Sequence, residues 1–129
     1  MNKLNKENIT GISALLIHAA KIDEMYSDHE KFLIKDFIKS YSKNENINEI
    51  LKSAEEMESN SNQLLNFTNI IKKKSLEIKK AIIECLWRVI ISDNTVDQYE
   101  SNLMRRICGL IYFSDKDSAE IKLKLINSK

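Results

Sequence analysis

Two helices and the polar loop between them can be recognised in residues 81–114, AIIECLWRVIISDNTVDQYESNLMRRICGLIYFS. Before the loop, apolar residues recur every three or four positions, which is the spacing of one helix face. With Ile78 just upstream, these residues are Ile82, Cys85, Leu86 and Val89. The same spacing returns after the loop at Leu103, Met104, Ile107, Cys108 and Ile111. The loop is polar. An acidic residue stands at each of its two ends, Asp93 at the start and Glu100 at the finish. The pattern predicts a unit of helix, acidic loop and helix.

A second copy of this unit lies seventy residues upstream. At that offset Asp23 aligns with Asp93 and Glu30 aligns with Glu100. Three apolar positions are also identical, namely Ile12 with Ile82, Leu16 with Leu86, and Leu33 with Leu103. The identities therefore fall on the apolar faces and on both acidic ends of the loop. We predict an internal duplication, with copies at approximately residues 10–41 and 78–112, in which each helix pair covers the apolar face of the other.

The apolar spacing predicts about seven helices in all. The first runs from Thr10 to Asp23, the second follows Ser27, the third starts at Asn48, and a fourth carries Leu64, Leu65, Phe67 and Ile71. The fifth begins near Ser75, the sixth follows Asp97, and Ser114 caps the last. The chain has no proline and only two glycines, whereas a β-protein would need many tight turns. We expect an all-α, single-domain helical bundle over residues 1–129.

Charge, hydropathy and cysteine spacing narrow the class of protein. The formal net charge is +1, so no global field attracts nucleic acid or an anionic membrane. The first ten residues are polar and lack the apolar core of a secretory signal, and the longest apolar stretches are too short to span a membrane. Cys85 and Cys108 have no Cys-x-x-Cys spacing, so we expect reduced, buried thiols. These features predict a cytoplasmic protein.

The acidic loops have two interpretations, of which the first is helix capping. Ser27 with Glu30, and Asp97 with Glu100, have the spacing of a capping box, in which the third helical residue reaches back to the backbone of the cap. Tyr26 and Val96 precede these caps and would supply hydrophobic staples. Capping alone explains most of the pattern.

The second interpretation is cation binding. An all-oxygen set of ligands suits hard cations such as Ca²⁺, Mg²⁺ or Mn²⁺ better than zinc. Each loop is too short for an EF-hand and lacks its ligand spacing. If the two copies place their loops side by side, one site can draw on both. The carboxylates concerned are Asp23, Asp28 and Glu30 in the first loop and Asp93, Asp97 and Glu100 in the second.

The second copy resembles the TerB-like family, which includes the tellurite-resistance protein TerB and the N-terminal domain of the membrane co-chaperone DjlA. The resemblance rests on Leu86-Trp87-Arg88-Val89 running into Asp93, followed by Val96, Glu100, Leu103, Arg105, Arg106 and Ile107. Residues 15–37, LLIHAAKIDEMYSDHEKFLIKDF, fit the same pattern more loosely. The family usually has a glycine directly after the loop aspartate, where this chain has Glu24 and Asn94. Tyr112 likewise stands where a helix-ending glycine is expected.

The resemblance implies an all-helical domain whose acidic loop residues chelate metal. By this resemblance, the metal-chelating role is expected of five residues in this chain, Asp23, Glu30, Asp93, Asp97 and Glu100. The implied cofactor is a divalent cation such as Ca²⁺, Mg²⁺ or Mn²⁺. Trp87 is expected to act as an anchor between helices, not as a binding platform. Arg88, Arg105 and Arg106 either neutralise the acidic loops or are solvated surface charges.

No set of residues completes a catalytic site or a cofactor-binding motif, so we expect a non-enzymatic helical module. It would act in stress response or as an interaction scaffold, with another protein as its partner. The alternative is a metal-independent adaptor domain related to the N-terminal domain of DjlA. One local basic cluster exists, at Lys72, Lys73, Lys74, Lys79 and Lys80. It lacks interleaved aromatic residues, so nucleic acid is not an expected partner. The oligomeric state stays open.

Overall fold

The computed structural model describes residues 4–21, 26–43, 46–61, 63–91 and 98–127, and of residues 98–100 it describes the backbone only. The described chain is all-α, as predicted, and contains no strand. Its helices are α1 (Lys6–Ala20), α2 (Asp28–Tyr41), α3 (Ile47–Asn60), α4 (Leu65–Lys72), α5 (Leu76–Ile91), α6 (Gln98–Ile111) and α7 (Asp115–Asn127). In this part of the chain no helix is both long enough and apolar enough to cross a lipid bilayer.

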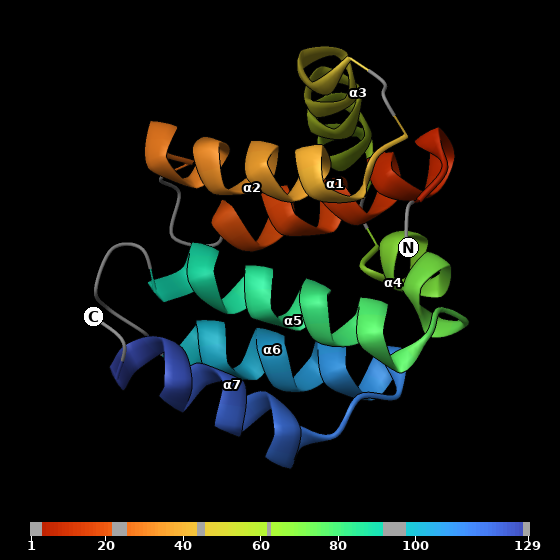
Figure 1. The fold of residues 1–129 in the computed structure, drawn as a ribbon. Coiled ribbons are helices and arrows are strands. Elements are labelled where there is room, and N and C mark those ends of the chain that lie inside the picture. The colour runs from red at the N-terminus through yellow and green to blue at the C-terminus, as the bar shows by residue number, and fades with distance from the viewer. Residues whose placement is uncertain (1–3, 22–25, 44–45, 62, 92–97, 128–129) are drawn as a thin grey trace.

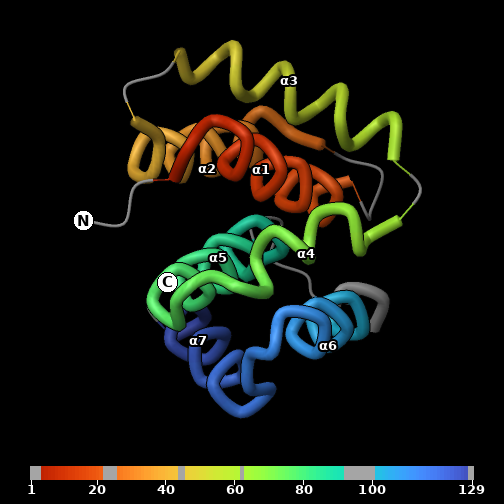
Figure 2. The backbone as a smooth tube through the Cα atoms, turned by 90° about the vertical axis from the view of Figure 1, so that its right-hand side faces the viewer, coloured from red at the N-terminus to blue at the C-terminus, as the bar shows by residue number. Residues whose placement is uncertain are grey.

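The helices form two layers (Figure 1). One layer contains α1, α2 and α3, and Figure 2 shows α3 crossing over the other two. The second layer contains α5, α6 and α7, and α4 connects the two layers while contacting both α1 and α6. Helix α5 packs against α1 and α2 on one side and against α6 and α7 on the other. Helices α1 and α5 are therefore the two central elements.

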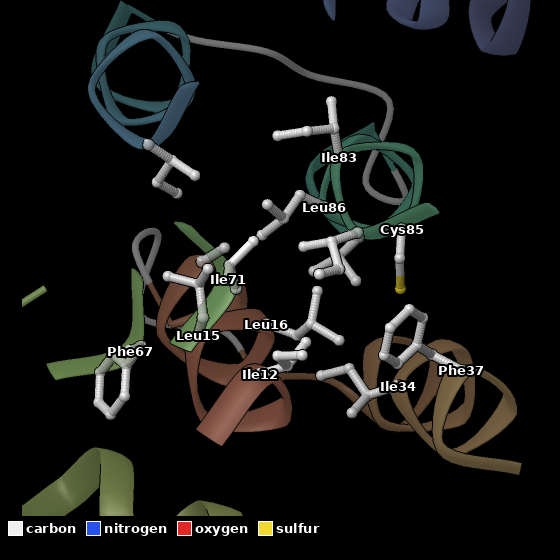
Figure 3. Close-up of a cluster of buried hydrophobic side chains, with 14 of the residues drawn as sticks. Ile12, Leu15, Leu16, Ile34, Phe37, Phe67, Ile71, Ile83, Cys85 and Leu86 are labelled. Carbon is white, nitrogen blue, oxygen red and sulfur yellow. The ribbon is translucent and has the colours of Figure 1, made fainter. Parts of the chain in front are cut away.

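The core lies where α1 meets α2, α4 and α5. Nearly all of α1 is buried from Ile9 onward, which explains why its sequence is apolar on more than one face. Figure 3 shows Leu16 of α1 beside Ile34 of α2 and below the α5 helix, with Leu15 close to Ile71 of α4. Cys85 points toward the Phe37 ring from across the α2–α5 interface. One hydrophobic cluster thus joins both layers.

The start of the first helix differs from the prediction. Helix α1 begins at Lys6 and not at Thr10, because the Asn5 side chain accepts the Asn8 backbone N–H at 2.8 Å and caps the helix there. Thr10 lies inside the helix, where its hydroxyl donates to the Lys6 carbonyl at 2.7 Å. The predicted end at Asp23 lies outside the described residues. The predicted start of α3 at Asn48 is also late, since Asn46 caps the helix and Ile47 is its first residue.

Serine caps set the starts of three later helices. Ser27 caps α2, Ser75 accepts the Ile78 backbone N–H at the start of α5, and Ser114 accepts the Asp117 N–H at the start of α7. Each cap satisfies a backbone donor that the first helical turn leaves without a partner. These three predictions are confirmed.

Helix α6 ends in a left-handed residue that is not glycine. Tyr112 has φ of 62°, and the next backbone N–H, that of Phe113, donates to the Cys108 carbonyl at 2.8 Å. This bond spans five residues, as in the Schellman motif, whose left-handed position glycine usually occupies. The chain therefore keeps a tyrosine at the position where the sequence pattern leads one to expect glycine.

Trp87 joins α5 to α7. Its ring is 4% exposed, and its indole Nε1 donates to the Ser118 Oγ at 2.9 Å. The Lys122 Nζ lies 5.1 Å from the centre of the ring. A buried indole that finds a hydrogen-bond partner is a strong packing element. Trp87 is the interhelical anchor that the sequence predicts.

Candidate functional site

Only one of the five predicted metal ligands has a described side chain. Glu30 lies in the first turn of α2. Asp23, Asp93 and Asp97 lie outside the described residues, as does the side chain of Glu100. Within the residues that the structure does describe, no group of three or more His, Cys, Asp or Glu side chains could hold a metal ion. The five-residue site therefore stays a prediction.

Glu30 forms the predicted capping box with Ser27. The Ser27 backbone N–H donates to the Glu30 Oε1 at 2.7 Å, and the Glu30 N–H donates to the Ser27 Oγ at 3.1 Å. Glu30 is only 5% exposed, so its carboxylate is held in one place at the helix start. Asp28, in the same turn, is exposed. The capping interpretation is thus confirmed for the first copy, while the equivalent pair Asp97 and Glu100 lies outside the described residues and side chains.

Tyr26, directly before this cap, packs against the hydrophobic core. The residue four positions into the helix, where a staple normally has an apolar partner, is Lys31. Its Nζ lies 5.0 Å from the centre of the Tyr26 ring, so a cation–π contact takes the place of an apolar one. Burial, and then the nearby Glu55 carboxylate, raise the pKa of Tyr26 far above its ordinary value. The phenol therefore stays neutral at physiological pH.

The four helix ends that adjoin the two acidic loops lie at the same end of the bundle. In Figure 1, α1 and α5 both run toward the left-hand end, and α2 and α6 both start there. Helices α1 and α5 also contact one another. The four helix ends that flank residues 22–25 and 92–97 therefore share one side of the molecule, as the duplicated arrangement would require. The duplication itself stays a prediction.

An ion-paired cluster near this end was not anticipated from the sequence. The Glu58 carboxylate of α3 accepts from the Lys21 Nζ at 2.9 Å and lies 3.3 Å from the His18 Nδ1, both at the end of α1. The Glu58 side chain is 12% exposed. Burial pushes the pKa of Glu58 upward, but hydrogen bonds and charge from Lys21 and His18 outweigh burial, so the pKa is lower than usual. This cluster ties α3 to α1.

A hollow of about 470 Å³ opens beside Glu58. It lies between α1, α3, α4 and α6, and its polar lining includes His18, Gln63 and Arg106. The contact between His18 and Glu58 could not be predicted from the sequence, because the two residues are forty positions apart. The Glu58 carboxylate in this lining is already engaged by Lys21 and His18, so the hollow does not offer it to a ligand.

Replacing Glu58 by glutamine removes its ion pairs with Lys21 and His18 and is expected to destabilise the protein by about 1 kcal/mol at pH 7. The loss is not larger because Lys21 and His18 are partly exposed and screened by solvent. The pKa of Glu58 is lower in the folded protein than its ordinary value of 4.5. The stabilisation is therefore present above pH 4.5 and is lost as the pH falls through the folded-state pKa. Urea unfolding of both proteins at pH 7 and pH 3 measures this difference.

The control is Glu56→Gln, which removes an exposed carboxylate from the same helix and should change stability by less than about 0.5 kcal/mol. If Glu58→Gln and the wild type differ by the same amount at pH 3 as at pH 7, the ion-pair assignment is wrong.

Arg88 and the two cysteines have structural explanations. Arg88 pairs with Glu84 one turn earlier on α5, at 2.7 Å, and this pair does not involve a loop. Both cysteines are free and buried, as predicted. Burial raises the pKa of Cys85 to about 12 and raises that of Cys108 as well, so neither thiol ionises at neutral pH.

The family model described as Tellurite resistance protein TerB matches residues 10–123, from within α1 to within α7. The matched range contains all five predicted metal ligands. No curated protein and no solved structure gives a significant match to the chain.

Proposed function

Since this chain belongs to the TerB family, we propose that it is a non-enzymatic helical module that binds a divalent cation through its two acidic loops. It would serve in stress response or as an interaction scaffold, inside the cytoplasm. The proposed ligands are Asp23 and Glu30 from the first loop and Asp93, Asp97 and Glu100 from the second.

The observation that carries this proposal is the shared position of the helix ends. Helices α1 and α5 end, and α2 and α6 begin, at one end of the bundle (Figure 1). A hard cation such as Ca²⁺ takes six to eight oxygen ligands, which is more than one short loop supplies. The carboxylates of two loops that adjoin these helix ends would together supply such a set. Because the capping box already holds the Glu30 carboxylate in place, little side-chain entropy is lost when it binds an ion.

A non-enzymatic role is supported by the state of the reactive groups. The two thiols are buried with raised pKa values, so they are poor nucleophiles. His18 is engaged by Glu58, and His29 is exposed on the surface of α2. None of these groups is placed to activate another one.

Divalent cations are expected to raise the melting temperature, because an ion that binds only the folded state stabilises it. At a free concentration of about 100 times the Kd, the gain is about 2.7 kcal/mol, or roughly 10 °C for a domain of this size. Thermal unfolding with Ca²⁺, Mg²⁺ or Mn²⁺, compared with chelator, measures the shift. Asp93→Asn combined with Glu100→Gln should remove it.

The matched control is Asp36→Asn with Glu56→Gln, which removes the same charge from exposed positions of α2 and α3 and should retain the shift. A wild-type protein whose melting temperature ignores all three cations would refute the proposal. In that case the loop variants would be merely less stable, and capping would be the whole role of the loops.

A metal-independent adaptor domain is the second candidate. Its support is an open groove of about 210 Å³ between α2 and α5, lined in part by Phe37, Tyr41 and Arg88. Phe32, on α2, is largely exposed as well. A protein partner retained in the presence of chelator, and lost in Phe32→Ser, would favour this function over metal binding.

A further inference from the structure

Tyr112, whose backbone is left-handed, follows α6 at the end of the bundle opposite the one where α1 and α5 end (Figure 1). Its side chain is 69% exposed although its backbone is left-handed, a conformation that disfavours side chains other than glycine. Burial in the core therefore does not explain the tyrosine at this position. A strained, exposed side chain is a reason to look for a binding role.

Lysines from two other helices converge on this ring. The Lys72 Nζ, from the end of α4, lies 5.2 Å from the ring centre, and the Lys79 Nζ, from α5, lies 6.0 Å from it. The turns between α4 and α5 and between α6 and α7 meet on the right-hand side of Figure 1, which faces the viewer in Figure 2. The aromatic residue that the basic cluster lacks in the sequence is thus supplied by the fold.

The charge at this end is positive. Lys73, Lys74 and Lys80 extend the cluster, and none of the ion pairs found among described residues involves any of its lysines. Carboxylates are also present: Asp117 and Glu120 line a hollow of about 210 Å³ together with Lys80 and Lys124. Burial and, second to it, the charge of Glu77 raise the pKa of Tyr41 on α2, so Glu77 lies toward α2. The lysines outnumber these acids, so the surface attracts anions.

An aliphatic side chain completes the surface. Leu76, the first residue of α5, is 68% exposed and borders the same hollow. We propose that Leu76, Tyr112 and the surrounding lysines Lys72, Lys79 and Lys80, here called the Tyr112 surface, bind the face of an anionic lipid bilayer. Lysines would contact lipid phosphates while Leu76 and the tyrosine ring enter the headgroup region.

Lipid fits this surface better than nucleic acid does. An exposed leucine gains nothing from a phosphate backbone, whereas it gains from apolar contact at a membrane interface. The cluster contains lysine and no arginine, so it lacks the bidentate donors that favour recognition of bases. Tyrosine is enriched at membrane interfaces because its ring is apolar and its hydroxyl is wet. The Tyr112 surface lies at the other end of the bundle from the ends of α1 and α5 (Figure 1), and the proposal does not depend on metal binding.

The test is sedimentation of the full chain with vesicles of phosphatidylglycerol and phosphatidylcholine in equal parts. We expect binding that weakens with added salt and is absent from pure phosphatidylcholine. Each lysine near an anionic surface is worth about fivefold in affinity, so Lys72→Gln/Lys79→Gln/Lys80→Gln should weaken binding at least about tenfold. The control Lys35→Gln/Lys39→Gln/Lys52→Gln removes the same charge from exposed positions of α2 and α3 and should change binding less than about twofold.

Two further variants separate insertion from charge. Leu76→Ser should weaken binding about tenfold through the loss of apolar contact. Tyr112→Gly relieves the left-handed backbone, so it should leave the melting temperature unchanged or higher while still weakening binding. The proposal fails if the vesicles do not bind, if the control set weakens binding as much as the cluster set, or if a single-stranded oligonucleotide binds and the vesicles do not.

Discussion

Replacing Trp87 by alanine is expected to lower the free energy of unfolding by about 3–5 kcal/mol, among the largest effects of any single substitution in this chain. The indole is buried where α5 meets α7, so its removal leaves a cavity that neighbouring side chains fill only in part. It also leaves the Ser118 hydroxyl, which is itself buried, without its donor. Chemical denaturation at neutral pH measures the loss.

Two milder variants separate the contribution of the hydrogen bond from that of the packed ring. Trp87→Phe keeps most of the ring volume but removes the indole N–H, and Ser118→Ala removes the acceptor. Each should cost about 1 kcal/mol, and the double variant should cost clearly less than their sum because both remove one hydrogen bond. A loss below about 1 kcal/mol for Trp87→Ala would mean that α7 does not depend on this anchor.

Leu16→Ala is expected to cost about 3–5 kcal/mol as well. Leu16 is fully buried on α1 and lies beside Ile34 of α2 and below α5, where both layers meet (Figure 3). Truncation opens a cavity at the centre of the cluster, and the surrounding helices are too closely packed to close it. The measurement is the denaturation midpoint at an unchanged slope.

Leu123→Ala is the matched control, since the same atoms are removed from an exposed position of α7. Its effect should stay within about 0.5 kcal/mol. Equal losses for Leu16→Ala and Leu123→Ala would contradict the burial assigned to α1.

Sequence reasoning predicts well what local interactions determine. Serine followed three residues later by an acid is enough to place the start of α2, because the capping hydrogen bonds are local. The α5 and α6 helices follow from apolar spacing, since every residue of both predicted stripes is buried, Val89 and Met104 among them. The helical class and the family resemblance follow from the same pattern.

Features that depend on packing are not accessible in this way. Asn5 as the cap of α1 is missed because the first turn of the helix, Lys6-Glu7-Asn8, has no apolar residue that would extend the pattern toward it. The pairing of Glu58 with Lys21 and His18 joins two helices distant in sequence. Tyr112 meets Lys72 and Lys79 only because two turns come together at one end of the bundle.

The candidate metal site depends on packing most of all. Spacing identifies Asp23 and Asp93 as equivalent positions, but whether two loops form one site depends on the orientation of their helix pairs. The structure shows that α1 and α5 end on the same side. The capping box of Glu30 shows in addition that one proposed ligand already has a structural role. Both roles are compatible, because a carboxylate has two oxygens and several acceptor positions.

The most direct test of the proposed cation site is a titration of the purified chain with Mn²⁺, followed by the electron paramagnetic resonance signal of the free ion. We predict one bound ion per chain, and a loss of binding both in Asp23→Asn and in Asp93→Asn, because a single site shared by two loops needs ligands from each. The control Asp36→Asn, at an exposed position on α2, should bind as the wild type does. Absence of a bound ion in the wild-type protein, or full binding after either loop aspartate is replaced, would contradict the shared site.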